Sequence, residues 1–339
     1  MTSPTERLRV DTPPGSGDRF PLLVGDFGGT NARFGWVRHA GAPLSEVTSL
    51  LCAEYPRPED AARSYLDRYQ ADVRPSCAAI AIAGAVSCDP IKVTNSHWVL
   101  ERDAFARHIG SSAIDIFNDF EAIAMVLPHL TPSDYRLVGA AVPNLDHPMG
   151  VIGPGTGLGV GGMVPVRGTP DAWQSWCGEG GHVTLAAATE YQRQVLLCAR
   201  MVYPHVSAER LVSGMGLPTL RDAVAEVEGL AIERTMGAEE ICMLGAARKD
   251  QLCERTMEAF CSFLGCIAGN LALTLGARGG LFIAGGIVPR LGDFFARSAF
   301  REQFEAKGRY EDYLRAISTP VITAANPGLQ GLARAGAAP

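Results

Sequence analysis

The sequence has no long hydrophobic run, no excess of positive charge and no paired-cysteine motif, and each absence excludes a class of protein. No apolar stretch reaches the roughly 18 to 20 residues that cross a membrane, and the N-terminus lacks the apolar core of a signal peptide. The 30 basic and 36 acidic residues leave a net charge of −6 without a basic stripe. We therefore expect a soluble cytoplasmic protein that binds neither a membrane nor nucleic acid.

The nine cysteines include no CxxC pair and no cluster with histidine at metal-ligand spacing. Several of them, such as Cys261 and Cys266, lie in apolar helical patterns. An odd number of cysteines in such positions favours a reducing compartment, in which thiols fill the core. A zinc site has little support.

The length of 339 residues suits two domains, or one domain with two lobes, and 47% hydrophobic residues can fill a large core. Residues 1–20 are rich in proline, glycine, serine and charge, so we expect a disordered tail. After the tail, buried strands alternate with helices, which indicates α/β layers. Strands are expected within residues 21–37, 76–86, 149–166 and 279–291, a strand followed by a helix over 113–130, and helices over 189–203 and 251–276.

Residues 22–37 and 149–166 repeat one pattern, in which a Gly/Thr turn joins two buried strands. The first glycine turn consists of Gly28, Gly29, Thr30 and Asn31, and the second glycine turn consists of Gly155, Thr156 and Gly157. Neither matches a P-loop or a dinucleotide fingerprint, since each turn joins strand to strand. A third glycine turn follows at Ala284–Gly286. We expect two related halves, each opening with a β-hairpin, with the first two turns facing each other across a cleft.

Glycine turns let backbone N–H groups converge on an anion, because no Cβ obstructs the approach. A polyphosphate held between two such turns needs a metal ion. Asp26, at the end of the first strand, is placed to orient hydrated Mg²⁺. The alternative is that the Asp26 carboxylate caps its own turn.

Two further groups of polar residues suggest chemistry. Asn118 and Asp119 follow an apolar strand, and ligands of open α/β sheets bind at the carboxyl ends of strands. Asp119 there either accepts a hydroxyl proton or caps the following helix. Glu179 and His182 lie three residues apart across two glycines, a loop that can present hydrogen-bonding groups to vicinal hydroxyls of a sugar. Metal binding by this pair lacks a third ligand.

Taken together, these stretches resemble the bacterial glucokinase family, within the superfamily of sugar kinases, actin and heat-shock chaperone ATPases. The matching stretches keep the family's order from about residue 22 to 332 and include LLVGDFGGTNARF, FNDFEAIA, GPGTGLGVG, GEGGHV and HVSAERLVSGMGL. The resemblance implies an α/β fold of two ribonuclease H-like lobes, as in actin-like ATPases, with the active site in the cleft between them. The small lobe would span 21–127 plus about 327–336, and the large lobe 128–326.

The resemblance also implies the reaction, which is transfer of phosphate from ATP to D-glucose with Mg²⁺, feeding glycolysis in the cytoplasm, by a homodimer. Asp119 matches the family's catalytic base. The residues that match sugar ligands are Asn95, Asn118, Asp119, Glu179, His182 and Glu209. The two glycine turns match phosphate loops, and the residues that match the region around adenosine are Ser213, Gly214, Gly285 and Gly286.

The sequence departs from the family at two positions. Phe27 stands where a small aliphatic residue is more usual, and Met215 where proline is more usual. We expect Phe27 to crowd the first glycine turn and Met215 to loosen a loop near the nucleotide. Two alternatives stay open, a kinase for another hexose and a sugar-binding regulator without activity. The chain lacks the zinc-binding cysteine cluster of the related ROK proteins and a preceding helix-turn-helix, which argues against that branch.

Overall fold

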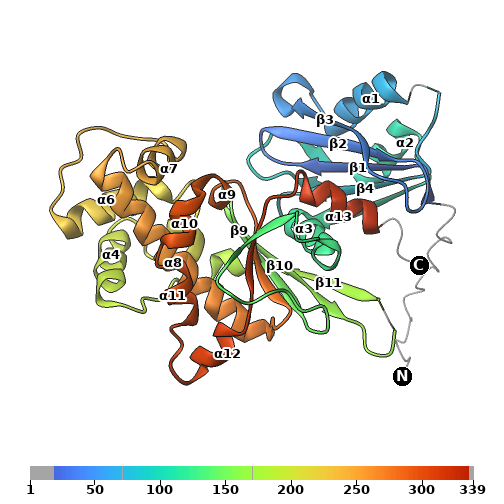
Figure 1. Cartoon of the computed structure of the whole chain (residues 1–339). Helices are drawn as coiled ribbons and strands as arrows, with labels where there is room; N and C mark the ends of the chain where they lie inside the picture. The colour runs from blue at the N-terminus through green and yellow to red at the C-terminus, as the bar shows by residue number, and fades with distance from the viewer. Residues whose placement is uncertain (1–18, 71, 170, 336–339) are drawn as a thin grey trace, which may run out of the picture. The chain divides into compact units, whose positions relative to one another are not determined.

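The computed structural model describes residues 19–70, 72–169 and 171–335. The expected tail lies outside these ranges, apart from Arg19 and Phe20. The chain forms two compact units (Figure 1). Of the described residues, the first contains those from Arg19 to Asp119 and from Leu329 to Ala335, and the second contains those from Phe120 to Gly328.

The first unit is built on a five-stranded sheet with the strand order β3-β2-β1-β4-β7. Its strands are β1 (Leu22–Phe27), β2 (Asn31–Val37), β3 (Ser45–Leu51), β4 (Cys77–Ile82) and β7 (Ala113–Asn118). β1, β2 and β3 are antiparallel neighbours, whereas β1, β4 and β7 run parallel. The unit also contains a small sheet and helices, namely β5 (Ile91–Lys92), β6 (Val99–Leu100), α1 (Pro58–Tyr69), α2 (Arg102–Ile109) and most of α13 (Pro327–Ala335).

One face of this sheet forms the core of the first unit. The alternating residues Leu23 and Phe27 of β1 are fully buried on that face, together with Tyr65 of α1 and Phe105 of α2. Both helices therefore cover the same face. Since side chains alternate along a strand, Asp26 projects from the opposite face.

The second unit is built on a six-stranded sheet with the order β11-β10-β9-β12-β13-β8. Its strands are β8 (Tyr135–Val138), β9 (Met149–Pro154), β10 (Leu158–Pro165), β11 (Trp173–Gly178), β12 (Gly280–Ile283) and β13 (Thr319–Ile322). β9, β10 and β11 are antiparallel neighbours, and β9, β12 and β13 run parallel. β8 is added antiparallel at the edge.

The two sheets repeat one topology. In each, the third, second and first strands form an antiparallel meander, and two parallel strands follow the first strand. The expected pair of related halves, each opening with a β-hairpin, is confirmed at the level of strand order. The two glycine turns occupy equivalent places, as the β1–β2 and β9–β10 turns.

Several helices of the second unit pack against the long helix α8 (Gln251–Leu275). Figure 1 shows α4, α6, α7 and α8 gathered at one end of the unit. α4 (Glu190–Arg200) begins with a capping box, in which Thr189 and Gln192 exchange side-chain and backbone hydrogen bonds. The remaining helices are α3 (Asp119–Val126), α5 (Ala208–Leu211), α6 (Leu217–Glu228), α7 (Ala238–Ala246), α9 (Val288–Leu291), α10 (Asp293–Arg297), α11 (Phe300–Glu305) and α12 (Glu311–Arg315).

Among the described residues, α8 is the one helix long and apolar enough to cross a membrane by length and composition. Most of its apolar stretch is buried inside the second unit, against α6, α7 and α11, so α8 has the surroundings of a core helix. Cys261 and Cys266 are buried within it, as expected, and burial raises the pKa of Cys261 to about 12. Cys88 and Cys177, by contrast, are exposed.

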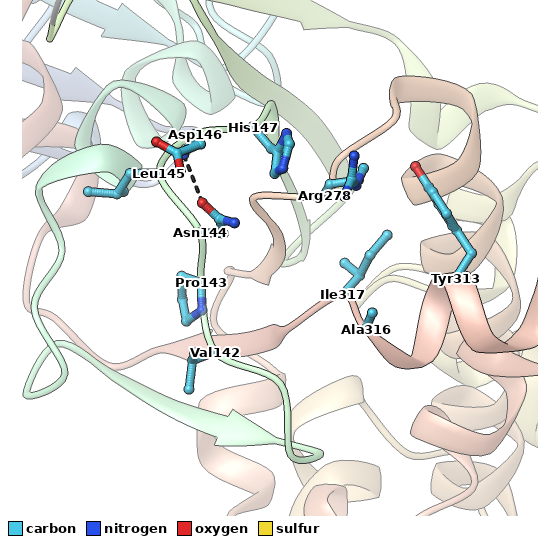
Figure 2. Close-up of a pocket in the computed structure, with 10 residues that line it drawn as sticks. All are labelled: Val142, Pro143, Asn144, Leu145, Asp146, His147, Arg278, Tyr313, Ala316 and Ile317. Carbon is cyan, nitrogen blue, oxygen red and sulfur yellow. Dashed lines mark hydrogen bonds between the residues drawn. The ribbon is translucent and has the colours of Figure 1, made fainter.

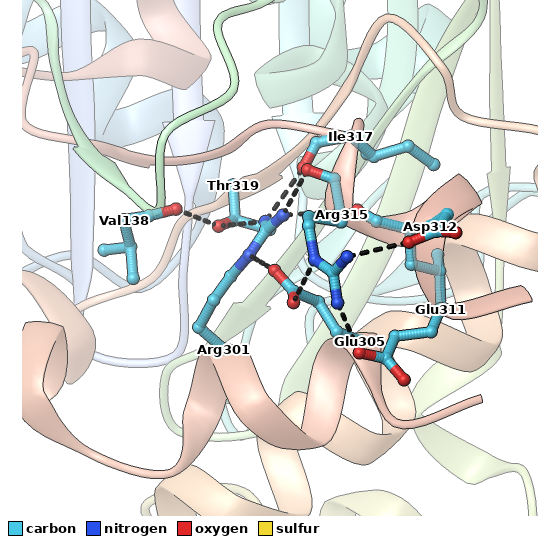
Figure 3. A network of polar contacts seen from close by, with 9 residues as sticks. Val138, Arg301, Glu305, Glu311, Asp312, Arg315, Ile317 and Thr319 are labelled. Atoms are coloured by element: carbon cyan, nitrogen blue, oxygen red, sulfur yellow. Dashed lines mark hydrogen bonds and ion pairs between the residues drawn. The ribbon is translucent and has the colours of Figure 1, made fainter. Parts of the chain in front are cut away.

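A largely buried arginine holds the last part of the second unit together (Figure 3). Arg301 of α11 donates to the carbonyl oxygens of Ile317 at 2.8 Å and Arg315 at 2.9 Å, to Thr319 Oγ1 at 3.0 Å, and pairs with Glu305. Thr319 Oγ1 donates in turn to the Val138 carbonyl at 2.6 Å. The network therefore joins α11, the segment after α12, β13 and β8.

The boundary between the units lies at Asp119, not at Leu127 as the sequence predicts. The reason is the packing of α3. The ring of Phe120 fills the space above glycines of the β9–β10 hairpin, and Glu121 accepts a 2.7 Å hydrogen bond from Ser175 Oγ of β11. Only Asp119, the first residue of α3, remains with the first unit.

Candidate active site

The predicted residues of the first unit lie at the carboxyl edge of its sheet. Phe27, Ile82 and Asn118 end β1, β4 and β7, and they are paired in register. The segments that follow are linked to one another, because Ala83 N donates to Phe27 O at 3.2 Å and Thr94 N donates to Ala83 O at 2.9 Å. This edge is where open parallel sheets bind ligands.

Two neighbouring segments hold the first glycine turn. Cys52 N donates to Thr30 O at 2.9 Å, and Cys52 Sγ lies 3.5 Å from Gly28 O. On the other side, a Cβ on Gly29 would lie only 2.9 Å from Asn95 O. The turn is therefore fixed in place against Asn95, an exposed residue with a φ of +58°. Cys52 carries no sequence signal that links it to the turn.

Asp26 has an unusual environment for a carboxylate. Burial raises the pKa of Asp26 above its ordinary value of 3.8, and the Arg33 guanidinium, 3.7 Å away, partly opposes the rise. About a quarter of the Asp26 side chain is exposed. Its carboxylate thus reaches the surface beside the first glycine turn and is partly neutralised by Arg33.

Phe27 does not crowd the first glycine turn, which corrects the sequence-based expectation. Its ring points into the core of the first unit and contacts the rings of Phe34, Trp98 and Phe105, with centroids 5.4 to 6.0 Å apart. The alternation of side chains along β1 explains this, because Phe27 shares the buried face with Leu23.

Asn118 and Asp119 span the junction of β7 and α3. Asn118 Nδ2 donates to Gly84 O at 3.2 Å, which links the end of β7 to the segment after β4. Asp119 is the first residue of α3, and both side chains are partly exposed.

The three predicted sugar residues of the second unit form one cluster. His182 Nε2 lies 3.8 Å from Glu179 Oε2, and His182 Nδ1 lies 4.0 Å from Glu209 Oε1. Glu179 and His182 are largely exposed, at 71% and 59%, whereas the Glu209 side chain is 21% exposed. The cluster can therefore offer both acceptors and a donor to a polyhydroxyl ligand.

Glu209 also contacts the second glycine turn. Its Oε2 accepts a 2.9 Å hydrogen bond from the N–H of Leu158, the first residue after the turn. A Cβ on Gly157 would overlap this carboxylate oxygen. The sequence contains no signal for this contact, since Glu209 and Leu158 lie 51 residues apart.

The segment Ser213–Gly216 is bound to the same turn. Gly214 N donates to Gly155 O at 2.8 Å, and Met215 N donates to Thr156 O at 3.1 Å. Met215 therefore tightens this segment, where the sequence predicts that it loosens it. A proline there has no N–H and could not make the second bond. Ser213 is fully buried, and its hydroxyl bonds to the backbone of Glu209 and Gly216.

The third glycine turn, which follows β12, lies beside Pro154, the last residue of β9. Gly285 has a φ of +81°, and its backbone lies so close to Pro154 that a Cβ would overlap the Pro154 carbonyl. Ile287 N donates to Pro154 O at 3.3 Å. The second unit thus brings its predicted phosphate, adenosine and sugar residues together around one strand end.

A pocket elsewhere in the second unit contains none of the predicted site residues. It has a volume of about 770 Å³ and is lined by the loop Val142–His147 together with Arg278, Tyr313, Ala316 and Ile317 (Figure 2). Within the described ranges, no three His, Cys, Asp or Glu side chains gather as a metal-binding group.

Comparison with known proteins decides the family. The glucokinase family model matches residues 23–338. Glucokinase from Chromobacterium violaceum is 43% identical over 316 residues, which cover 93% of this chain and 89% of that protein. The chain belongs to the glucokinase family. The family, the actin-like ATPase fold and the glucose-kinase activity that the sequence predicts are thereby confirmed.

Solved structures agree with this membership. The crystal structure of glucokinase from an Antarctic psychrotroph superposes with a TM-score of 0.82 at 32% identity, covering 93% of this chain and 98% of that one. A ROK family glucokinase from Streptomyces griseus, in complex with glucose and AMPPNP, has a TM-score of 0.61 at 18% identity, covering 93% and 98%. At this low identity, the second comparison shows only a shared fold.

Proposed function

We propose that this glucokinase transfers the γ-phosphoryl group of ATP to the 6-hydroxyl of D-glucose, with Asp119 as the general base. The carboxylate takes the proton of the 6-hydroxyl as that oxygen attacks the phosphorus in line with the leaving ADP. The position of Asp119 at the carboxyl end of β7, beside Asn118, supports this role.

In this proposal, Asn95, Asn118, Glu179, His182 and Glu209 hold the hydroxyls of glucose. The single observation that carries it is the cluster of Glu179, His182 and Glu209 beside the second glycine turn. Three adjacent hydrogen-bonding side chains next to an anion-binding turn suit a sugar kinase, because the reaction needs the hydroxyl acceptor and the phosphate donor in one place.

The two glycine turns hold the phosphates of ATP. Among the described residues, no acceptor pairs with the N–H groups of Thr156 and Gly157, so both are available to an anion. The segments Ser213–Gly214 and Gly285–Gly286 lie against the second turn and line the side of the nucleotide towards adenosine.

Asp26 fits an indirect role at Mg²⁺. It is a single, partly exposed carboxylate beside a phosphate turn, and Mg²⁺ characteristically combines one or two carboxylates with waters and substrate phosphates. When bound, the ion neutralises charge on the phosphates. Asp26 would hold the ion through its bound waters.

Further parts of the proposal rest on the family resemblance alone. These are a cytoplasmic location, a place at the entry of glucose into glycolysis, and a homodimer. Analytical ultracentrifugation tests the homodimer directly.

The test of the reaction is a coupled assay of ADP release with and without glucose. We expect ADP release to depend on glucose. Its rate should be higher with glucose than with mannose or fructose at equal concentration. ADP release that is independent of sugar would contradict the proposal. A panel of phosphoryl donors, with polyphosphate beside ATP, tests the donor.

A further inference from the structure

The carboxylate of Glu209 lies between the predicted sugar cluster and the second glycine turn, and its two oxygens have different neighbours. Oε1 lies 4.0 Å from His182 Nδ1, and Oε2 accepts the hydrogen bond from Leu158 N. We propose that Glu209 is a positioning residue for the nucleotide phosphates as well as a sugar ligand. The inference rests on the proposed function and adds to it a physical link between the two substrate sites.

The contact with the turn is specific. Oε2 occupies the space where a side chain of Gly157 would lie, and it accepts the N–H of Leu158 at 2.9 Å. Because that N–H is engaged by the carboxylate, the N–H groups of Thr156 and Gly157 are the ones left for a phosphate. Glu209 therefore decides which backbone donors of the turn face the ligand.

The backbone of Glu209 strengthens the link. Its carbonyl accepts a 2.7 Å hydrogen bond from Ser213 Oγ, and the segment after Ser213 donates to Gly155 O and Thr156 O. Side chain and backbone of Glu209 thus hold the second glycine turn from two directions. A shift of α5 on sugar binding would be passed to the turn through these bonds.

Glu179 provides the matched comparison. It belongs to the same cluster, 3.8 Å from His182 Nε2, but its side chain is 71% exposed and makes no hydrogen bond to the turn in the described part of the chain. Replacing a residue that binds only the sugar should leave the affinity for AMPPNP unchanged, and Glu179 represents such a residue.

The experiment measures the Kd of AMPPNP with Mg²⁺, without glucose, by calorimetry. The proteins are the wild type, Glu209→Ala, Glu209→Gln and Glu179→Ala, with Glu233→Ala as a control for removal of an exposed charge. We expect Glu209→Ala to weaken AMPPNP binding about tenfold, the size expected for loss of a charge-assisted hydrogen bond. Glu209→Gln keeps an acceptor for Leu158 N and should stay within about threefold of the wild type, as should the other two variants.

The inference is overturned if Glu209→Ala binds AMPPNP as Glu179→Ala does, or if Glu209→Gln loses as much as Glu209→Ala. Melting curves identify any variant that fails to fold, and Glu209→Gln keeps the test decisive in that case. The proposed function fails by a different result, the absence of glucose-dependent ADP release by the wild type.

Discussion

Glu209 Oε2 lies 2.9 Å from the backbone nitrogen of Leu158, so a predicted sugar ligand supports a predicted phosphate turn. A side chain at Gly157 must displace this carboxylate, whereas a Cβ on Gly155 meets nothing within 4 Å. The two ends of one short turn therefore differ in what a methyl group would disturb.

We predict that Gly157→Ala raises the KM for glucose by about tenfold, because the displaced carboxylate loses its place beside His182. Gly155→Ala adds the same methyl group into open space and should leave the KM for glucose within about twofold. Steady-state kinetics at saturating ATP measures both. Equal effects of the two substitutions on this constant would contradict the contact.

Asp119→Asn should abolish turnover and leave glucose binding within about tenfold of the wild type. The amide keeps hydrogen bonding but cannot accept the proton of the attacking hydroxyl. Turnover is measured by ADP release, and binding by intrinsic fluorescence or calorimetry. A variant that keeps more than about a tenth of the wild-type kcat would show that Asp119 is not the base.

Glu179→Gln should lower kcat/KM for glucose by about tenfold to a hundredfold, since each charge-assisted hydrogen bond contributes roughly 1.5–3 kcal/mol. The KM for ATP should change much less, because the described ion pair of the Glu179 carboxylate is with His182. The alternative is that Glu179 only supports its glycine loop. In that case the melting temperature would fall, and glucose and ATP binding would weaken together.

Asp26→Asn should stabilise the fold at the expense of activity. Burial raises the pKa of Asp26, so the folded state holds its proton more tightly than the unfolded chain does. The free energy of unfolding then falls as pH rises from the unfolded pKa through the folded pKa, and the penalty is complete above the folded pKa. We expect the variant to melt at a higher temperature than the wild type at pH 8, with the difference shrinking towards pH 4.

The same variant should lose at least about tenfold in kcat/KM, because it no longer carries the charge that orients hydrated Mg²⁺. Arg33 loses its partner in this variant, but its exposed guanidinium remains hydrated, so the cost is small. A stability difference that does not vary with pH would refute the assignment.

Arg301→Met should lower the free energy of unfolding by about 3 kcal/mol, because it leaves the carbonyls of Arg315 and Ile317 without their donor in a largely buried place and leaves Glu305 with only its longer ion pair to Arg315. The neighbouring Arg315 is a matched control. Its guanidinium is 56% exposed and pairs with Asp312 at 2.7 Å (Figure 3), so Arg315→Met should cost at most about 1 kcal/mol. Urea titration measures both, and similar losses would argue that Arg301 is no more important than a surface arginine.

Features carried by local patterns could be predicted from the sequence. The two glycine turns, the strand-to-helix junction at Asn118 and Asp119, and the long helix near 251–276 all depend on neighbouring residues, and the structure contains each of them. The pairing of Glu179 with His182 is also local, since three residues separate them.

The remaining features depend on residues far apart in the chain. The alternation along β1 could have placed Phe27 in the core, but its neighbours Trp98 and Phe105 come 71 and 78 residues later in the chain. The end of the first unit at Asp119 follows from the packing of Phe120 against a distant hairpin. The bond from Met215 N to Thr156 O, and that from Leu158 N to Glu209, arise only once the fold has formed.

The ring of Phe120 lies over Gly153 and Gly159, and a Cβ at either position would overlap it, whereas a Cβ at Gly161 would meet the backbone carbonyl of Phe120. The aromatic side chain and the two glycines under its ring should therefore vary together. Among relatives, a larger residue at position 159 should occur only together with a smaller one at position 120, and the reverse change should be tolerated alone. Since Asp119 directly precedes Phe120, such paired substitutions would show how much the position of the proposed base can vary among relatives.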